Sequence, residues 1–448
     1  MEKKTDVVII GGGPAGVVTA STARKYYPDK SITLMKSIEH GCIPCGIPYM
    51  FSSLENPDDN KLSTDPLEKK GIDVVVDEAI SVLPDTKIVE TKNGDTYSYE
   101  KLVLAVGSEP IIPPIKGMDK DGVFPIFKDM TYLNEVVEKV KKKKKVLVIG
   151  GGFIGVEFAD EIATLDGIEV TLVEMLPNLL ANSFDKEFSV LAEEKLRNRG
   201  VTVIKNARVE ELIGNDHVEK ARLSNGEVLS VDSVILGIGA RPDIALAKDA
   251  GLEIGKCNGV LVDEYMRTST PDIFAVGDCS CKRDFFTRKA TSVMLASTAT
   301  AEARVAGANL YKIKVVRENK GTIAVYSTYI NGLVLSSAGL TQQSAEKEGF
   351  EIIVGEVEGV DKHPGTLPGA SKSKIKLVFS KQSGIILGGQ ISCGMSCAQL
   401  VNLIGVAIQK RMSATELETL QLATHPYLTS SPTQYPVVLA AQDASGKM

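Results

Sequence analysis

A pair of cysteines near the N-terminus offers the clearest redox chemistry in this chain. Cys42 and Cys45 are separated by two residues in segment 41–49, which reads Gly-Cys-Ile-Pro-Cys-Gly-Ile-Pro-Tyr. This spacing permits a disulfide that opens and closes during turnover. A cysteine directly before a helix would also have a lowered pKa, because the positive helix end stabilises a thiolate. The alternatives are two buried thiols without chemistry, or half of a zinc site. No second Cys-x-x-Cys pair or histidine-rich segment accompanies the pair, so we predict no metal.

Two glycine-rich segments each follow an apolar run and would position a phosphate group. Residues 11–16 (Gly-Gly-Gly-Pro-Ala-Gly) follow the run 7–10, and residues 150–155 (Gly-Gly-Gly-Phe-Ile-Gly) follow the run 146–149. Each pattern predicts a strand, a tight turn and a helix whose N-terminus binds a pyrophosphate. Two such loops in one chain predict two bound dinucleotides, as in an electron-transferring flavoprotein. The loop positions expected to bind cofactor are Gly11, Gly13, Pro14, Ala15, Gly16, Gly150, Gly152, Phe153, Ile154 and Gly155.

An acidic residue at the end of the strand that follows a glycine loop binds the adenosine ribose and favours NADH over NADPH. Glu174 follows the apolar run 170–173, where its carboxylate would bind ribose hydroxyls and repel a 2′-phosphate. We therefore predict NADH over NADPH at the second loop. At the corresponding place after the first loop the acid is missing, and Met35 and Lys36 stand there instead. We expect the first ribose to be bound by backbone groups or by Lys36.

Composition narrows the class of protein. The chain has 448 residues, 43% of them hydrophobic, and a formal net charge of −6, which gives no electrostatic case for binding nucleic acid or a membrane surface. No apolar stretch has the length of a membrane span, and Met1 leads directly into a strand pattern rather than a signal peptide, so we expect a cytoplasmic protein. Seven cysteines in that compartment do not predict a structural disulfide framework. The cysteines to which we assign no role are Cys257, Cys279, Cys281, Cys393 and Cys397.

The motifs together resemble the FAD-dependent pyridine nucleotide–disulfide oxidoreductases, over nearly the whole length. The similarity includes both glycine loops, residues 45–49, residues 99–108, residues 239–242 and residues 275–278. Within that family the chain resembles the single-cysteine branch of coenzyme A-disulfide reductases, persulfide and polysulfide reductases, and NADH oxidases and peroxidases. The resemblance implies that Cys45 faces a flavin and that the C-terminal third forms a homodimer lending residues to the partner's site. The further positions it assigns to cofactor binding are Val106, Gly107, Gly239, Gly277 and Asp278.

Several residues depart from the family pattern and restrict which branch of the family the chain can resemble. Peroxidases and many oxidases of the family have a catalytic histidine where this chain has Pro14, which cannot transfer a proton. Tyr427 matches a tyrosine that coenzyme A reductases supply to the partner's site, although a second family tyrosine is replaced by Thr366 and Leu367. His425 is similar to the acid–base histidine of the two-cysteine branch, but Ser430 stands where that branch has a carboxylate.

We therefore predict an α/β fold with two Rossmann-like dinucleotide-binding domains and an α+β C-terminal dimerisation domain. The predicted segments are 1–115 and 243–320 for FAD, 116–242 for NAD, and 321–448 for dimerisation. The predicted activity is NADH-dependent reduction of a small disulfide, persulfide or polysulfide, with or without coenzyme A, through Cys45. Cys42 is either its disulfide partner or a packing residue, and Tyr427 or His425 protonates the leaving thiolate. The alternatives are an NADH oxidase that uses a sulfenate at Cys45, and a reductase of an electron-carrier protein.

Overall fold

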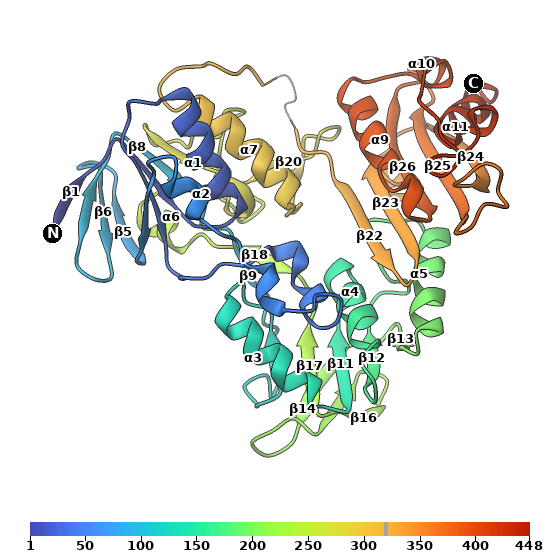
Figure 1. Cartoon of the computed structure of the whole chain (residues 1–448), viewed down its shortest axis with the longest axis horizontal. Coiled ribbons are helices and arrows are strands. Elements are labelled where there is room, and N and C mark those ends of the chain that lie inside the picture. The colour runs from blue at the N-terminus through green and yellow to red at the C-terminus, as the bar shows by residue number, and fades with distance from the viewer. Residues whose placement is uncertain (318–320) are drawn as a thin grey trace. The chain divides into compact units, whose positions relative to one another are not determined.

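The computed structural model describes residues 1–317 and 321–448, which form two compact units (Figure 1). The chain passes between these units several times. The predicted boundary at residue 320 lies outside the described residues. The first unit comprises residues 1–112, 125–141 and 239–322, and the second comprises residues 113–124, 142–238 and 323–448.

A five-stranded parallel sheet forms the centre of the first unit. Its strand order is β19-β8-β2-β3-β4, so the order reverses beside β2, where the first glycine loop begins. Ligands of open α/β sheets bind at such a reversal, beyond the carboxyl ends of the strands. The strands are β2 (Val7–Ile10), β3 (Ile32–Lys36), β4 (Asp73–Val76), β8 (Lys101–Leu104) and β19 (Ile273–Ala275).

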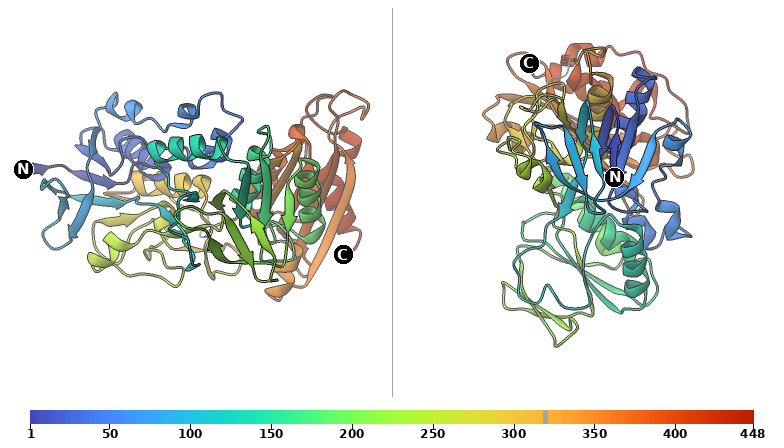
Figure 2. Two further views of the ribbon diagram at one scale, coloured as in Figure 1. Left: turned by 90° about the horizontal axis from the view of Figure 1, so that it is seen from below. Right: turned by 90° about the vertical axis from the view of Figure 1, so that its left-hand side faces the viewer.

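The alternating side chains of β2 separate two hydrophobic layers. Val7 and Ile9 pack with α1 (Pro14–Tyr26) and α7 (Ala296–Ala308), which lie side by side in Figures 1 and 2. Val8 and Ile10 pack on the opposite face, against a second sheet. Both faces are apolar because a parallel sheet is covered on both sides.

That second sheet is antiparallel in part and contains the predicted hairpin at Asn93 and Gly94. Gly94 has a φ of +83°, in the left-handed region that the turn requires. The sheet has the order β1-β7-β6-β5. Its strands are β1 (Glu2–Lys4), β5 (Ala79–Leu83), β6 (Ile88–Thr91) and β7 (Thr96–Ser98). The remaining regular elements of this unit are α2 (Asp65–Glu68), β9 (Ser108–Pro110), α3 (Met130–Lys141), β18 (Ala240–Pro242), α6 (Ala245–Asp249), β20 (Lys282–Arg283) and β21 (Ala290–Thr291).

The second unit contains two five-stranded sheets. The first has the order β10-β17-β11-β12-β13, with β17, β11, β12 and β13 parallel, and holds the second glycine loop. Its elements are β10 (Val123–Pro125), β11 (Lys145–Ile149), α4 (Phe153–Ile162), β12 (Glu169–Val173), α5 (Lys186–Asn198), β13 (Thr202–Ile204) and β17 (Ser233–Leu236). A small antiparallel sheet adds β14 (Val209–Ile213), β15 (Lys220–Leu223) and β16 (Val228–Ser230).

The other five-stranded sheet belongs to the C-terminal part and is antiparallel, in the order β22-β23-β26-β25-β24. Together with the two parallel sheets, it confirms the predicted α/β class with an α+β C-terminal part. Its strands are β22 (Val325–Ile330), β23 (Leu333–Gly339), β24 (Ile352–Val360), β25 (Lys372–Ser380) and β26 (Ile386–Cys393). Its helices are α8 (Gln342–Lys347), α9 (Leu400–Gln409), α10 (Ala414–Glu418) and α11 (Pro436–Ser445).

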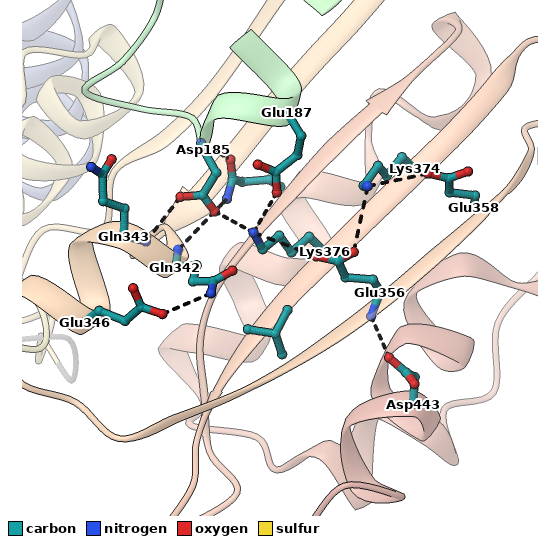
Figure 3. Close-up of polar contacts among 12 residues, drawn as sticks. Asp185, Glu187, Gln342, Gln343, Glu346, Glu356, Glu358, Lys374, Lys376 and Asp443 are labelled. Carbon is teal, nitrogen blue, oxygen red and sulfur yellow. Dashed lines mark hydrogen bonds and ion pairs between the residues drawn. The ribbon is translucent and has the colours of Figure 1, made fainter. Parts of the chain in front are cut away.

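A buried polar network joins α5 to the antiparallel sheet (Figure 3). Asp185 precedes α5 and receives hydrogen bonds from the backbone N–H of Gln342 (3.2 Å) and the side-chain amide of Gln390 (2.6 Å). Lys376 Nζ lies 3.1 Å from Asp185 and 2.6 Å from Glu187. Burial alone would lower the pKa of Lys376, but the two carboxylates outweigh it and raise that pKa. Removing one partner of such a buried pair costs about 3–5 kcal/mol, so the network fixes these elements together.

No helix among the described residues is long and apolar enough to cross a membrane.

Candidate active site

The first glycine loop connects β2 to α1 and is shaped by close backbone approach. Gly11 has a φ of +121°, and a Cβ there would lie 2.1 Å from the carbonyl oxygen of Ala105. A Cβ on Gly16 would lie 1.8 Å from the carbonyl oxygen of Gly11, so both positions require glycine. No side chain caps the first turn of α1, and open space surrounds the position of a Cβ on Gly13. The loop thus presents an uncapped helix N-terminus to a pyrophosphate.

Two further predicted segments meet this loop. A Cβ on Gly11 would lie 3.1 Å from the backbone nitrogen of Val106, and a Cβ on Gly277 would lie 2.9 Å from the Cβ of Ala15. Gly107 has a φ of +81° and Gly277 a φ of +76°, so both turns need the left-handed region. The structure therefore brings together the predicted positions from residues 11–16, 106–107 and 277–278.

The second glycine loop, between β11 and α4, repeats this geometry. Gly150 has a φ of +104°, and a Cβ on Gly155 would lie 1.8 Å from the Gly150 carbonyl oxygen. No side chain caps α4 at Gly152. Phe153 stacks on Tyr326 with ring centroids 5.0 Å apart, whereas Ile154 is 42% exposed. A dinucleotide pyrophosphate fits this cradle as it fits the first.

Glu174 closes the second loop. Its carboxylate accepts a hydrogen bond from the backbone N–H of Gly151 at 2.5 Å and from that of Leu176 at 2.6 Å. The side chain is buried beside the loop. Each carboxylate oxygen retains a second lone pair, which suits the hydroxyls of a ribose.

The first loop has Lys36, and not Met35, at the position of Glu174. Gly11 donates its N–H to the Met35 carbonyl at 2.8 Å, as Gly150 donates to Val173. Met35 therefore corresponds to Val173, and its side chain is fully buried in the core. We expected Met35 to border the cofactor, but its side chain lies in the core and only its backbone carbonyl contacts the loop. A Cβ on Gly12 would lie 2.8 Å from the Cβ of Lys36, whose Nζ donates to the carbonyl of Glu39 at 2.8 Å.

The segment that carries the two cysteines is folded into short 3₁₀ turns. Cys45 lies inside the turn Pro44–Gly46 and is exposed, and a second turn, Pro48–Met50, follows. The expected helix directly after Cys45 is absent from this described segment. A helix dipole therefore does not lower the pKa of Cys45 in the way expected from the sequence.

Cys42 has a different environment from Cys45. It is a buried thiol, 4% exposed, whose pKa burial raises to about 11, while the charge of Lys128 acts in the opposite direction. Asn60 anchors Ile43, one of the two residues between the cysteines. Its backbone carbonyl accepts from the Ile43 N–H at 2.9 Å, and its side-chain amide donates to the Ile43 carbonyl at 3.2 Å. Both cysteines are thiols in this structure, so the Cys42–Cys45 disulfide, one of the two alternatives for Cys42, is not formed here.

Asp278 takes part in a polar cluster that the sequence did not reveal. Its Oδ2 accepts a hydrogen bond from the Ser108 hydroxyl at 2.7 Å, and Lys128 Nζ donates to Ser108 Oγ at 2.7 Å. Lys128 Nζ also lies 3.4 Å from Asp278. Lys128 belongs to no recognisable motif, and it is the cation that acts on the thiol of Cys42.

Three other residues predicted for the site, Gly239, His425 and Tyr427, belong to other segments of the chain. Gly239, with a φ of +98°, lies in the first unit and accepts from the N–H of Ile111 at 3.1 Å. His425 and Tyr427 lie in the second unit, in an exposed loop where Tyr427 is 52% exposed. His425 Nδ1 accepts from the backbone N–H of Tyr427 at 3.3 Å, so its neutral form has the ring proton on Nε2. The His363 N–H donates to the Pro426 carbonyl at 3.1 Å and anchors this loop.

Four of the other cysteines are paired, which corrects the expectation of no structural disulfides. Cys257 bonds to Cys281, 24 residues away, and Cys393 bonds to Cys397. Cys279 is a fully buried thiol whose pKa burial raises to about 11. Among the described residues, no group of three or more His, Cys, Asp or Glu side chains could hold a metal ion.

A half-buried acid lies one turn after the start of α4 and was not predicted. Glu157 Oε1 accepts a hydrogen bond from Thr328 at 2.7 Å. Burial raises the pKa of Glu157 to about 7, with the nearby Glu161 adding to the shift and Thr328 opposing it. A carboxyl group that titrates near neutral pH so close to a nucleotide loop is a candidate functional group.

Comparison with known proteins agrees with this geometry. The family model described as pyridine nucleotide-disulphide oxidoreductase matches residues 5–303, and the model of that family's dimerisation domain matches residues 325–435. An NADH oxidase of Methanocaldococcus jannaschii is 34% identical and aligned over 98% of this chain and 99% of its own length. An NAD(P)H coenzyme A polysulfide/persulfide reductase of Pyrococcus horikoshii is 34% identical, over 87% of each chain.

A solved structure shares the fold over the whole chain. The NAD-dependent persulfide reductase from A. fulgidus superposes with a TM-score of 0.92 at 31% identity, covering 100% of this chain and 83% of its own. Sequence, fold and both nucleotide loops lead to one classification: this chain is an oxidoreductase of the pyridine nucleotide–disulphide oxidoreductase family.

Proposed function

We propose that this protein is an NADH-dependent flavoprotein that reduces a small disulfide, persulfide or polysulfide through Cys45. The observation that carries the proposal is the exposed thiol of Cys45 on a turn of the unit that holds the first nucleotide loop. The names of the relatives from P. horikoshii and A. fulgidus support a sulfur substrate. We place this chemistry in the cytoplasm, as expected from the sequence.

Each of the two glycine loops would bind one of the two cofactors. The first loop, with Gly107 and Asp278, would hold FAD, which when bound supplies the transfer of two electrons from nicotinamide to sulfur. The uncapped N-terminus of α1 supports this assignment. The second loop would hold NADH, and Glu174 would bind the hydroxyls of its adenosine ribose. A carboxylate at that place repels a 2′-phosphate, which favours NADH over NADPH.

Cys45 performs the sulfur chemistry in two steps. Its thiolate attacks one sulfur of a substrate R–S–S–R′, so that a Cys45–S–S–R bond forms and R′S⁻ leaves and takes up a proton. Two electrons from NADH, with one proton, then cleave this mixed disulfide, releasing RSH and restoring the thiolate. Since the thiol of Cys42 is buried and its pKa is raised to about 11, it is poorly suited to attack substrate, and this supports the single-cysteine version of the cycle.

A proton donor for the leaving thiolate would come from a second copy of the chain. Tyr427 is exposed on the C-terminal part, within the residues that match a dimerisation domain. We propose that Tyr427 of the partner subunit protonates the leaving sulfur, with His425 of the partner subunit as the other candidate. Loss of turnover in Tyr427→Phe but not in His425→Gln would assign the role to the tyrosine.

The proposal is tested by Cys45→Ser. Sulfur reduction should disappear, while NADH should still bleach the flavin in a single anaerobic turnover, because the nucleotide loops are unchanged. Cys42→Ser is the matched control and should retain most of the turnover. Sulfur reduction that survives in Cys45→Ser would refute the proposal.

An NADH oxidase is the second candidate, since the relative from M. jannaschii has that name. In that case Cys45 would cycle through a sulfenate. Pro14 argues against peroxide chemistry of this kind, because it offers no proton donor within the first loop.

A further inference from the structure

A cavity lies at the edge of the first unit's parallel sheet that is opposite to the glycine loop. Its volume is about 820 Å³. Its wall includes Lys101 and Asp272, at the amino ends of the parallel strands β8 and β19. The loop at residues 11–16 follows the carboxyl end of β2, which is parallel to β8. The cavity is therefore separate from the predicted flavin site.

Positive charge predominates in the wall of this cavity. Seven lysine and arginine side chains line it, against four carboxylates. Three of these carboxylates are already paired with cations of the same wall. The pairs are Lys101–Asp272, Arg267–Asp263 at 2.6 Å and Lys282–Glu302 at 3.5 Å.

Outside these pairs, the wall has four cations, Arg283, Arg288, Lys312 and Arg317, and one carboxylate, Glu264. Of the four, Arg283, Lys312 and Arg317 form no ion pair within residues 1–317 and 321–448. Arg317 is half-buried, and its Nη1 donates to the backbone carbonyl of Glu264 at 3.2 Å. Burial lowers the pKa of Arg317, and repulsion from the nearby Arg288 acts in the same direction; attraction from Glu302 and Glu264 opposes the shift but does not cancel it. A bound anion in the cavity would further compensate the positive charge of Arg317.

The size and the side chains of the cavity restrict what that group can be. Cavities that bind small ligands measure roughly 300–1,000 Å³, so this one accommodates a nucleotide-sized molecule. Guanidinium groups present several N–H donors in a planar fork that matches the oxygens of a phosphate. Tyr311 and Ile313 add apolar surface to the same wall, and Ile313 is 54% exposed.

We propose that this cavity is a binding site for a small phosphate-bearing anion, with Arg317 as its principal contact and Arg283 and Lys312 at its margin. The proposal does not depend on the sulfur substrate, because no residue of the cavity belongs to the nucleotide loops or to the cysteine segment.

The absence of tryptophan from the sequence allows a direct test. Ile313→Trp places a single fluorescent reporter on the cavity wall. The flavin-loaded enzyme would be titrated with inorganic pyrophosphate and, separately, with ADP, in both cases with NAD⁺ at saturation so that the second loop is occupied. We expect a saturable change in tryptophan fluorescence. Adding Arg317→Gln should weaken the apparent affinity by about tenfold, the effect of losing one charge-assisted contact.

Arg208→Gln in the same reporter background is the matched control, since Arg208 is an exposed arginine of the second unit, paired with Glu210 at 3.0 Å. It should leave both titrations unchanged. Similar affinities for pyrophosphate and ADP would show that the phosphate alone is recognised, whereas tighter binding of ADP would identify a nucleotide. The absence of a saturable change with either probe, or an unchanged response in Arg317→Gln, would overturn the proposal. If Arg317→Gln fails to fold, the exposed Arg283→Gln replaces it in the same comparison.

Discussion

The ammonium group of Lys128 lies 3.4 Å from Oδ2 of Asp278, and both contact the hydroxyl of Ser108 at 2.7 Å. The carboxylate of Asp278 thereby has a fixed orientation and a partly compensated charge. Because this cation also acts on Cys42, one lysine connects the aspartate to the cysteine segment.

Lys128→Met should therefore weaken the retention of FAD. The loss of one partly exposed charge-assisted contact predicts an affinity lower by about three- to tenfold. The measurement is the dissociation constant of FAD from the deflavinated protein. Lys69→Met, at an exposed lysine of the same unit, is the control. Unchanged FAD affinity in Lys128→Met would remove the lysine from the account of the site.

Glu157 makes stability depend on pH. Its pKa of about 7 in the folded protein exceeds the ordinary value of 4.5, so the native state binds an additional proton between these values. Stability due to this group is therefore highest below pH 4.5 and declines as the pH rises to about 7. Glu157→Gln removes the dependence, and the variant should gain up to about 3 kcal/mol over the parent at pH 8 but little at pH 4.5.

The measurement is the free energy of unfolding in urea at several pH values, with the exposed Glu194→Gln as the control. A constant difference between Glu157→Gln and the parent at every pH would show that folding does not raise the pKa of Glu157.

Selectivity between NADH and NADPH should depend on Glu174. Glu174→Gln keeps an acceptor for the Gly151 N–H but removes the negative charge that repels a 2′-phosphate. The ratio of kcat/KM for NADH to that for NADPH should fall by about tenfold, the equivalent of 1.4 kcal/mol. Glu169→Gln, at the exposed amino end of β12, should leave the ratio unchanged. An unchanged ratio in Glu174→Gln would place the selectivity elsewhere.

Lys36 offers the complementary experiment at the first loop. Since Lys36 occupies the position of Glu174, Lys36→Glu would provide an acceptor both for the Gly12 N–H and for ribose hydroxyls. FAD should then dissociate more slowly, by about three- to tenfold, a factor that one such hydrogen bond supplies. Stopped-flow release of FAD measures this directly. Faster release from Lys36→Glu would mean that the lysine itself binds the cofactor.

Local features of the fold followed from the sequence, whereas contacts between distant segments did not. The loops at residues 11–16 and 150–155 were predictable because the pattern of strand, glycines and helix is continuous in the sequence, and Gly16 and Gly155 are required by contacts within their own loops. The position of Met35 was misjudged by one residue, because the end of a buried strand cannot be read from an unbroken apolar run. The prediction of a helix directly after Cys45 was wrong, because two short 3₁₀ turns occupy this segment.

Lys128 and the bond from Cys257 to Cys281 illustrate what the sequence alone could not supply. Lys128 is 150 residues from Asp278 and stands in no motif. Cys257 and Cys281 are 24 residues apart, on segments that only tertiary folding brings together. In both cases the sequence showed what each side chain can do chemically, but it did not show which residue that side chain contacts.

The central claim, reduction of sulfur through Cys45, is tested most directly by the rate of NADH consumption per bound FAD under strict anaerobiosis with polysulfide, compared with the rate in air without sulfur. The account predicts fast anaerobic turnover that Cys45→Ser abolishes, and slow consumption with oxygen alone. Fast oxygen-dependent turnover with no response to polysulfide would contradict it and identify an NADH oxidase.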